Sequence, residues 1–365
     1  MISKKKGKWS LLCVVIFVIT PYILLFSTKF LPTSYKFETT SLPVIPEEIK
    51  STLKQDSYKF ETTSLPVIPE EIKSTLKQGS YSSPRGNFSS FYVNIMPGPD
   101  EPQINQIFLH LMSQSRCALN NSETFIIDVG LNVGYFSLLS SAYDCFYVLS
   151  LDPQIFCHQL YRLSRSMSNF TNKWNSYLNA AWFRPAQLRT QRNICDPGYS
   201  LNRRNKIIPE TNETVIVQSI AVDSLPELQL HPSSNILLVK IDTEGAEIGV
   251  LLSCQKLIES NRIDNFIIEL MNHQWPVLMQ KDFTNFEEVG LKVLSDLQKK
   301  YEAILLADTD FSDEIIAWSS SSSLKSNFLR GFRAVIPEGP KGFPVLLENR
   351  NRLKRGCNIW FTRRP

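Results

Sequence analysis

The sequence predicts an α/β domain with a doubly wound, mostly parallel sheet, preceded by a membrane anchor and a stem. Three observations predict this organisation. Residues 9–28 form an uncharged apolar segment, a 23-residue unit is repeated in tandem, and short apolar runs alternate with helical patterns from about residue 104 onward. Such alternation is typical of parallel sheets that carry helices on both faces.

The N-terminus is expected to anchor the chain in a membrane. The four lysines of residues 1–8 account for the whole formal net charge of +4, so the remaining chain is neutral and a nucleic-acid partner is disfavoured. A helix over residues 9–28 would span about 30 Å, the thickness of a hydrocarbon core. Because positive charge is heavier before this segment than after it, we expect a cytosolic tail and a lumenal remainder, a type II membrane protein of the Golgi.

A cleaved signal peptide is the alternative interpretation of this segment. The apolar run is long for a signal peptide, and Phe26-Ser27-Thr28-Lys29-Phe30 lacks the small residues of a cleavage site. The sequence therefore favours an uncleaved anchor.

In a lumenal location, cysteines can form disulfides and N-glycosylation sequons can be used. Six cysteines follow the anchor, and we expect one to three disulfides among them. No CxxC or Cys/His ligand spacing is present, so no metal site is predicted. Sequons begin at Asn87, Asn120, Asn169 and Asn212.

Residues 29–103 are expected to form a stem and linker. Residues 34–56 and 57–79 are copies of one sequence and differ only at Asp56 and Gly79. Two copies are too few for a solenoid, so a spacer is the first interpretation and a partner-docking helix the alternative. The lumenal domain is then expected over residues 104–365.

Within this domain the elements follow one another in α/β order. Apolar runs predict strands at 124–128, 146–152, 176–180, 235–242, 266–269, 303–306 and 358–361. Helical patterns occupy 135–142, 154–167, 246–260 and 285–300. Ligands of such a sheet bind at the carboxyl ends of its strands, where this sequence places several acids.

The first candidate site is the turn Asp128-Val129-Gly130-Leu131-Asn132-Val133-Gly134, between a predicted strand and a helix. Its glycines allow the backbone to approach a ligand. Asp152 ends the next strand, where a carboxylate can accept the ribose hydroxyls of an adenosine ligand. Because the third glycine of a pyrophosphate-binding turn is missing, a nucleoside without phosphates is favoured, and S-adenosylmethionine is the common one. A purely structural tight turn is the alternative.

The second candidate site is the segment from Lys240 to Glu247, Lys-Ile-Asp-Thr-Glu-Gly-Ala-Glu. Ionisable groups directly after an apolar strand lie where a hydrophobic core would not accept them. A polar helix start with its acids at the positive end of the helix dipole is the structural alternative.

These two segments, with Asp152-Pro153, Asn179-Ala180-Ala181, Val222-Asp223-Ser224-Leu225 and Phe266-Ile267-Ile268-Glu269, resemble the FkbM-type S-adenosylmethionine-dependent methyltransferases. The resemblance extends from about residue 124 to residue 361. It implies a class I methyltransferase fold with a seven-stranded sheet, S-adenosylmethionine as donor, and methylation of a hydroxyl. Leu131 and Asp152 depart from the family pattern, which usually has Ala and Glu there.

The resemblance also implies roles for individual residues. Asp128, Gly130, Asn132 and Gly134 would shape the methionine side of the cofactor pocket, and Asp152 would bind the ribose. A hydroxyl needs a base before it becomes a good nucleophile, and Asp242 is the first choice, followed by Glu244 and Glu269. Lys240 is expected to orient Glu244 or Glu269 by an ion pair.

The sequence therefore predicts an O-methyltransferase acting on a hydroxyl, and the expected lumenal location favours a glycan as acceptor. One alternative is a catalytically silent methyltransferase-like module that binds partners in membrane trafficking. Another is a glycosyltransferase, because Asp308-Thr309-Asp310 matches an Asp-x-Asp motif. His273 and Trp275 are further candidates for the acceptor pocket, and the basic C-terminus, which includes Arg350, is expected to be solvated.

Overall fold

The computed structural model describes residues 77–83, 86–92, 101–115, 123–143, 145–168, 170, 172–191, 195, 214–306, 312–316, 318 and 334–364. The expected anchor, almost all of the duplicated stem and the Asp308-Thr309-Asp310 motif lie outside these residues, as do the sequon residues Asn120, Asn169 and Asn212. Among the residues that are described, no helix is both long and apolar enough to cross a membrane.

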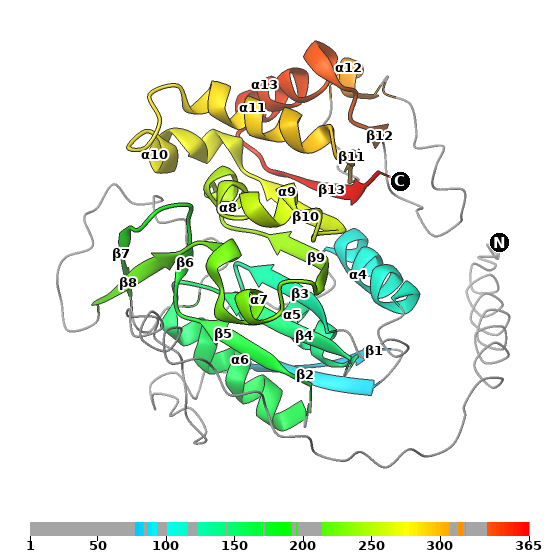
Figure 1. The fold of residues 1–365 in the computed structure, drawn as a ribbon, viewed down its shortest axis with the longest axis vertical. Helices are drawn as coiled ribbons and strands as arrows, with labels where there is room; N and C mark the ends of the chain where they lie inside the picture. Colours follow the sequence, from blue (N-terminus) through cyan, green and yellow to red (C-terminus); the bar gives the residue numbers. More distant parts are fainter. Residues whose placement is uncertain are drawn as a thin grey trace, which may run out of the picture. The chain divides into compact units, whose positions relative to one another are not determined.

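The described chain is built on an eight-stranded sheet (Figure 1) with the order β12-β11-β13-β10-β9-β3-β4-β5. The strands β5, β4, β3, β9 and β10 are parallel, whereas β13 runs antiparallel to both of its neighbours. Their bounds are β3 Thr124–Val129, β4 Phe146–Leu151, β5 Trp174–Tyr177, β9 Asn235–Ile241, β10 Asn265–Leu270, β11 Tyr301–Leu305, β12 Ala334–Val335 and β13 Cys357–Arg363.

This topology confirms the doubly wound, mostly parallel sheet predicted from the sequence. Seven of its strands are those expected, and the eighth is the two-residue edge strand β12, which pairs antiparallel with β11. The prediction of seven strands was therefore one short. A strand of two residues is too short to produce a recognisable alternation of apolar side chains.

Both faces of the sheet are buried. Successive residues of β3 point to opposite faces, so Ile126 packs in one hydrophobic cluster and Ile127 in the other. The helices that cover the sheet are α4 Pro102–Gln114, α5 Tyr135–Ser141, α6 Ile155–Ser168, α7 Pro226–Leu230, α8 Glu247–Ser253, α9 Gln255–Glu259, α10 Trp275–Met279, α11 Phe286–Gln298, α12 Asp313–Ile316 and α13 Phe343–Leu353. Short 3-10 turns occupy Val222–Ser224, Asn272–Gln274 and Gly339–Lys341.

Two smaller sheets accompany the main one. The order β6-β8-β7 joins Ala180–Ala181, Thr214–Ile220 and Gln187–Gln191, directly after β5 in the chain. An antiparallel pair, β1 Lys77–Ser83 and β2 Gly86–Tyr92, forms from residues that the sequence placed in the stem and linker. Since β2 packs against α6, these residues are in contact with the domain that carries the eight-stranded sheet.

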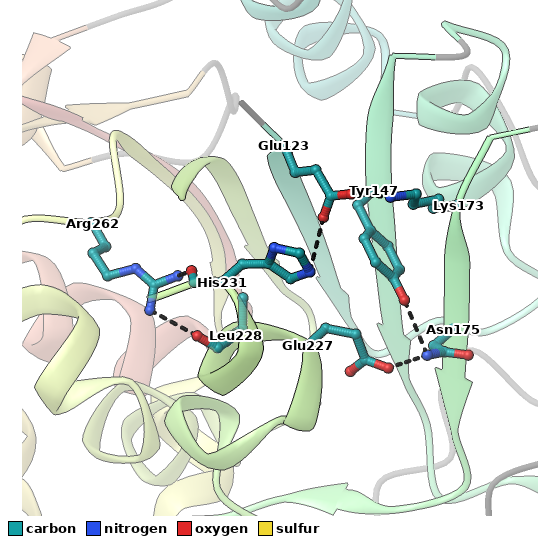
Figure 2. A network of polar contacts seen from close by, with 8 residues as sticks. All are labelled: Glu123, Tyr147, Lys173, Asn175, Glu227, Leu228, His231 and Arg262. Atoms are coloured by element: carbon teal, nitrogen blue, oxygen red, sulfur yellow. Dashed lines mark hydrogen bonds and ion pairs between the residues drawn. The ribbon is translucent and has the colours of Figure 1, made fainter. Parts of the chain in front are cut away.

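A polar network ties the strand β5 to the helix α7 (Figure 2). Asn175 Nδ2 donates to the carboxylate of Glu227, which is buried. The Tyr177 hydroxyl donates to the other oxygen of the same carboxylate. Asn175 Nδ2 also lies 3.3 Å from the Tyr147 hydroxyl on β4. The network therefore fixes three elements next to one another on the side of the sheet where the chain enters β5.

One of the expected disulfides is described in full. It joins Cys157 on α6 to Cys195 in the segment between β7 and β8, with 4.9 Å between their Cα atoms. Cys145 is also disulfide-bonded, and Cys254 is a buried free thiol. The expectation that the basic C-terminus is solvated is wrong for Arg350, which is fully buried at the end of α13.

Candidate active site

The turn between β3 and α5 has the backbone conformation that its glycines predicted. Gly130, Asn132 and Gly134 all have positive φ angles, of 92°, 49° and 85°. Gly130 is required for a second reason, because a Cβ atom at this position would overlap the carbonyl oxygen of Asp242. The turn is therefore packed directly against the carboxyl end of β9, where the second candidate segment begins.

Asp152 follows β4 and faces this turn. Its Oδ2 accepts a hydrogen bond of 3.0 Å from the backbone N–H of Asn132, and its Oδ1 accepts one of 2.7 Å from the backbone N–H of Gln154. Burial raises the pKa of Asp152 to about 7, although both backbone donors favour the charged form. The carboxylate is thus held in a fixed orientation with lone pairs left for further donors.

Asp128, at the end of β3, lies on the inner side of the turn. Its Oδ2 accepts a hydrogen bond of 2.6 Å from Ser137 Oγ, which lies 2.8 Å from Ser150 Oγ. Its Oδ1 is buried and has no hydrogen-bond partner among the described residues. Burial raises the pKa of Asp128 to about 6, and the charge of Lys240 limits the shift. A buried acceptor of this kind fits a ligand that carries a positively charged or hydrogen-bonding amine.

Lys240 connects the two candidate segments. In the sheet register it lies beside Asp128, and its ammonium group donates a hydrogen bond of 2.7 Å to Asp242 Oδ2. Burial alone would lower its pKa, but the charges of Asp242 and Asp128 raise it instead, so Lys240 stays protonated. The expectation that Lys240 pairs with Glu244 or Glu269 is replaced by this pair with Asp242. Side chains two residues apart on a strand point to the same face, which brings Lys240 and Asp242 together.

Asp242 and Glu269 form a coupled pair of carboxyl groups. Burial would raise the pKa of Asp242, but the charge of Lys240 and hydrogen bonds from Glu269 and Lys240 hold it below its usual value. The charge of Asp242, burial and the shared hydrogen bond raise the pKa of Glu269 well above its usual value. Glu269 is therefore the protonated partner and Asp242 the carboxylate, whose side chain is 25% exposed.

Glu101 is a residue of this site that the sequence analysis assigned to the linker. It precedes α4, and its Oε1 accepts a hydrogen bond of 3.3 Å from Asn358 Nδ2. Asn358 lies opposite Glu269 in the pairing of β10 with β13. The charge of Glu101 contributes to the raised pKa values of Lys240 and Glu269. The apolar spacing of Ile104, Ile107, Phe108 and Met112 was the signal that a helix begins at this point.

A pocket of about 650 Å³, including space open to solvent, joins the two candidate segments. Five residues predicted from the sequence line it, namely Gly130, Asn132, Asp152, Asp242 and Glu244. Asp128, Gly134 and Glu269 are not among the lining residues. Glu269 is hydrogen-bonded to Asp242, which does line the pocket. Asn179, Ala180 and Ala181 also line the pocket, although the sequence analysis assigned them no role.

Glu247 and Trp275 hold the backbone beside the pocket-lining residues Glu244 and Ala246. Glu247 is fully buried, accepts a hydrogen bond of 2.5 Å from the backbone N–H of Gly245, and accepts one of 3.0 Å from Trp275 Nε1. Trp275 is itself buried, so it packs against the body of the domain and has no face free for an acceptor. His273 Nε2 lies 3.2 Å from Gln274 Nε2. No three His, Cys, Asp or Glu side chains of the described chain are placed to hold a metal ion.

The family profile of the FkbM methyltransferase domain matches residues 88–290, more than half of the chain. The chain belongs to this family of methyltransferases. Membership confirms the predicted cofactor, S-adenosylmethionine. The orphaned Asp128 Oδ1 and the oriented Asp152 carboxylate fit the amine and the ribose hydroxyls of this cofactor.

Several solved methyltransferase structures match this chain at low similarity. They include an O-methyltransferase from Bacillus cereus in complex with SAH, at 8% identity and a TM-score of 0.35, covering 74% of this chain and 83% of that chain. A SAM-dependent methyltransferase from Agrobacterium tumefaciens has 8% identity and a TM-score of 0.31, with 62% of each chain covered. Precorrin-6y C5,15-methyltransferase from Geobacter metallireducens has 8% identity and a TM-score of 0.30, covering 71% and 89%. No curated protein matches the sequence significantly.

Proposed function

We propose that this methyltransferase transfers the methyl group to a hydroxyl of a glycan. The observation that carries the proposal is the position of Asp242. Its half-buried carboxylate lines the same pocket as Gly130, Asn132 and Asp152, the residues that fit the cofactor. A hydroxyl that donates a hydrogen bond to Asp242 would thus lie beside the cofactor.

The cofactor supplies an electrophilic methyl group on a sulfonium centre. The chain has to hold an acceptor oxygen in line with that group and remove its proton. Asp242 would accept the proton that the acceptor hydroxyl loses when it takes up the methyl group, and the demethylated cofactor would be the leaving group. Because its pKa is held low, Asp242 is ionised at neutral pH and is ready to accept a hydroxyl hydrogen bond. A low pKa also makes it a weak base, so proton transfer accompanies methyl transfer and does not precede it.

Lys240 and Glu269 position this base. Lys240 fixes the orientation of Asp242 by the 2.7 Å ion pair, and protonated Glu269 donates the second hydrogen bond. Neither group has to give up its own proton for the reaction. Glu244 lies on the pocket wall at a positive φ of 54° and is the second candidate for contact with the acceptor.

The N-terminal part of the sequence supports the location that we propose for the acceptor. The uncharged segment 9–28, preceded by four lysines, supports a type II anchor in the Golgi with the methyltransferase domain in the lumen. The Cys157–Cys195 disulfide supports an oxidising compartment. Glycans are the abundant hydroxyl compounds of that compartment, which is why we propose them as acceptors.

The experiment compares the full-length protein with its Asp242→Asn variant. Each is incubated with methyl-labelled S-adenosylmethionine and oligosaccharides released from secretory glycoproteins, and methylated products are detected by mass spectrometry. We expect labelled oligosaccharides with the wild-type chain and a loss of about 100-fold or more with Asp242→Asn, with cofactor affinity retained. Asp296→Asn is the control, since Asp296 is exposed on α11 and pairs only with Lys292 and Lys299 in the described structure.

Two results would overturn parts of this proposal. Full turnover by Asp242→Asn would show that another residue is the base. Absence of S-adenosylmethionine binding to the wild-type chain in calorimetry would exclude the enzyme, and a binding module in membrane trafficking would then be the better function.

A further inference from the structure

The Cys157–Cys195 disulfide lies against the proposed cofactor site. Cys157 is fully buried in the first turn of α6, five residues after Asp152. The next residue, His158, holds the same segment in place, because its Nε2 lies 2.7 Å from the carbonyl oxygen of Asp152. Burial lowers the pKa of His158 to about 4, so this ring is neutral and its contact does not change around neutral pH.

The other half of the bridge reaches the turn that follows β3. Cys195 Sγ lies 3.3 Å from Oδ1 of Asn132, and a bridged sulfur has no proton to donate, so this is a packing contact. The backbone N–H of Asn132 is the group that donates to Asp152 Oδ2. The disulfide thus connects α6, which follows Asp152, with the side chain of the residue that orients the Asp152 carboxylate.

Asn132 needs such support because of its backbone conformation. Its φ of 49° lies in the left-handed region, which is unfavourable for a residue with a Cβ atom compared with the right-handed region. Asn tolerates this conformation better than most residues, but the side chain is then free to reorient unless something packs against it. In the described structure Cys195 provides that packing.

We propose that the Cys157–Cys195 disulfide is a redox-sensitive part of the cofactor site, which keeps Asn132 on Asp152 while the bridge is intact. The inference rests on the proposed function, since it concerns the same pocket. A dithiol reductant would supply two electrons and two protons, break the S–S bond and leave two thiols, while the dithiol itself becomes a disulfide. Cys195 would then no longer be tied to α6, and cofactor affinity would fall.

The test is calorimetry of the full chain with S-adenosylmethionine, before and after treatment with dithiothreitol. We expect the oxidised chain to bind at least threefold more tightly than the reduced chain, and Cys195→Ser to bind like the reduced chain under both conditions. Cys254→Ser is the control, because Cys254 is buried in the hydrophobic cluster that contains Ile127 and is not disulfide-bonded. Equal affinities of the oxidised and reduced chains would overturn the inference.

A second variant separates a positioning role from a loss of stability. Asn132→Gly keeps the left-handed backbone and the N–H donor but removes the side chain that Cys195 contacts. We expect reduction to have little further effect on affinity in this variant. If reduction weakens binding equally in Asn132→Gly and in the wild type, the bridge does not act through Asn132 and the inference is wrong.

Hydrogen exchange distinguishes this inference from the proposed function. The amide of Asn132 should exchange more slowly in the oxidised than in the reduced ligand-free chain, because its hydrogen bond to Asp152 is then better maintained. If the oxidised chain does not bind S-adenosylmethionine, the proposed function fails, and unequal exchange at Asn132 still supports the role of the bridge. Equal exchange in both states would overturn it.

Discussion

Lys240 on β9 lies beside Asp128 on β3 in the parallel register and bonds Asp242 at 2.7 Å. One buried cation therefore serves both halves of the pocket, the carboxylate that fits the cofactor amine and the carboxylate that would receive the acceptor proton. The ring of Phe136, with its centroid 4.9 Å from Lys240 Nζ, covers the ammonium group. The arrangement couples the charge state of the two halves.

Replacing Lys240 by Met tests this coupling. The variant leaves two neighbouring carboxylates without their cation, and removal of one partner of a buried ion pair typically costs about 3–5 kcal/mol. We expect the free energy of unfolding in urea to fall by an amount in that range, and methyl transfer to be lost. Lys299→Met is the matched control, because Lys299 is 72% exposed and its pairing with Asp296 should contribute about 1 kcal/mol or less. Similar losses in both variants would contradict the coupling.

Two glycines with positive φ allow a matched test of the turn after β3. Gly130→Ala would place a Cβ atom on the carbonyl oxygen of Asp242. Gly339 also has a positive φ, of 76°, but a Cβ atom added there would have no atom within 4 Å. We expect Gly339→Ala to cost about 1–2 kcal/mol, the price of the left-handed conformation alone. Gly130→Ala should cost clearly more and abolish cofactor binding in calorimetry. Equal stability of the two variants would mean that the turn can move away from β9.

The sequence alone predicted those site residues whose positions are set by the strand that they follow. Gly130, Asn132 and Asp152 follow parallel strands at the same edge of the sheet, so their proximity follows from the topology. The pairing of Lys240 with Asp242 required knowledge of which face each side chain takes. The predicted strand over 235–242 contains both residues, so its alternation places them on one face, but the sequence prediction paired Lys240 with Glu244 or Glu269.

Glu101 and β12 were missed for a different reason. The position of Glu101 depends on how α4 packs in the hydrophobic cluster that contains Ile126 and Phe136, and its contact with Asn358 joins residues 257 positions apart. No local pattern encodes such a contact. The pair of Asp242 and Glu269 was predicted as two candidates for one role, and only the structure separates them into a carboxylate and its protonated partner.

The polar network around Glu227, which Figure 2 shows in part, predicts a stability effect away from the pocket. Tyr177→Phe removes a donor from the buried carboxylate of Glu227, and a buried acceptor that loses its partner costs about 1–3 kcal/mol. Tyr147→Phe is the control, because the Tyr147 hydroxyl contacts only Asn175 within this network, at 3.3 Å. We expect urea unfolding to show a larger loss for Tyr177→Phe. A larger loss for Tyr147→Phe would mean that Glu227 is satisfied without Tyr177.

The last prediction concerns pH and uses the raised pKa of Asp152. Burial brings this pKa to about 7, and only the ionised carboxylate can accept hydrogen bonds from both ribose hydroxyls. Affinity for S-adenosylmethionine should therefore be highest above about pH 7 and should fall by up to about tenfold for each pH unit below it. Calorimetry from about pH 5.5 to about pH 8.5 at constant ionic strength measures this dependence. Asp152→Asn should bind weakly at every pH and lose the step near pH 7.

The raised pKa of Asp152 affects the stability of the ligand-free chain in the opposite direction from its effect on cofactor affinity. Measuring both quantities against pH therefore separates binding from folding. An unfolded Asp loses its proton near pH 4, whereas Asp152 and Asp128 keep theirs until about 7 and about 6. Between these values the folded chain binds more protons than the unfolded chain, so its free energy of unfolding falls as pH rises from about 4 to about 7. Urea unfolding without ligand should show this decrease, and saturating S-adenosylmethionine should offset it at the upper end of the range. A ligand-free stability that rises over this range, together with a pH-independent affinity, would mean that neither carboxyl group is buried as the structure places it.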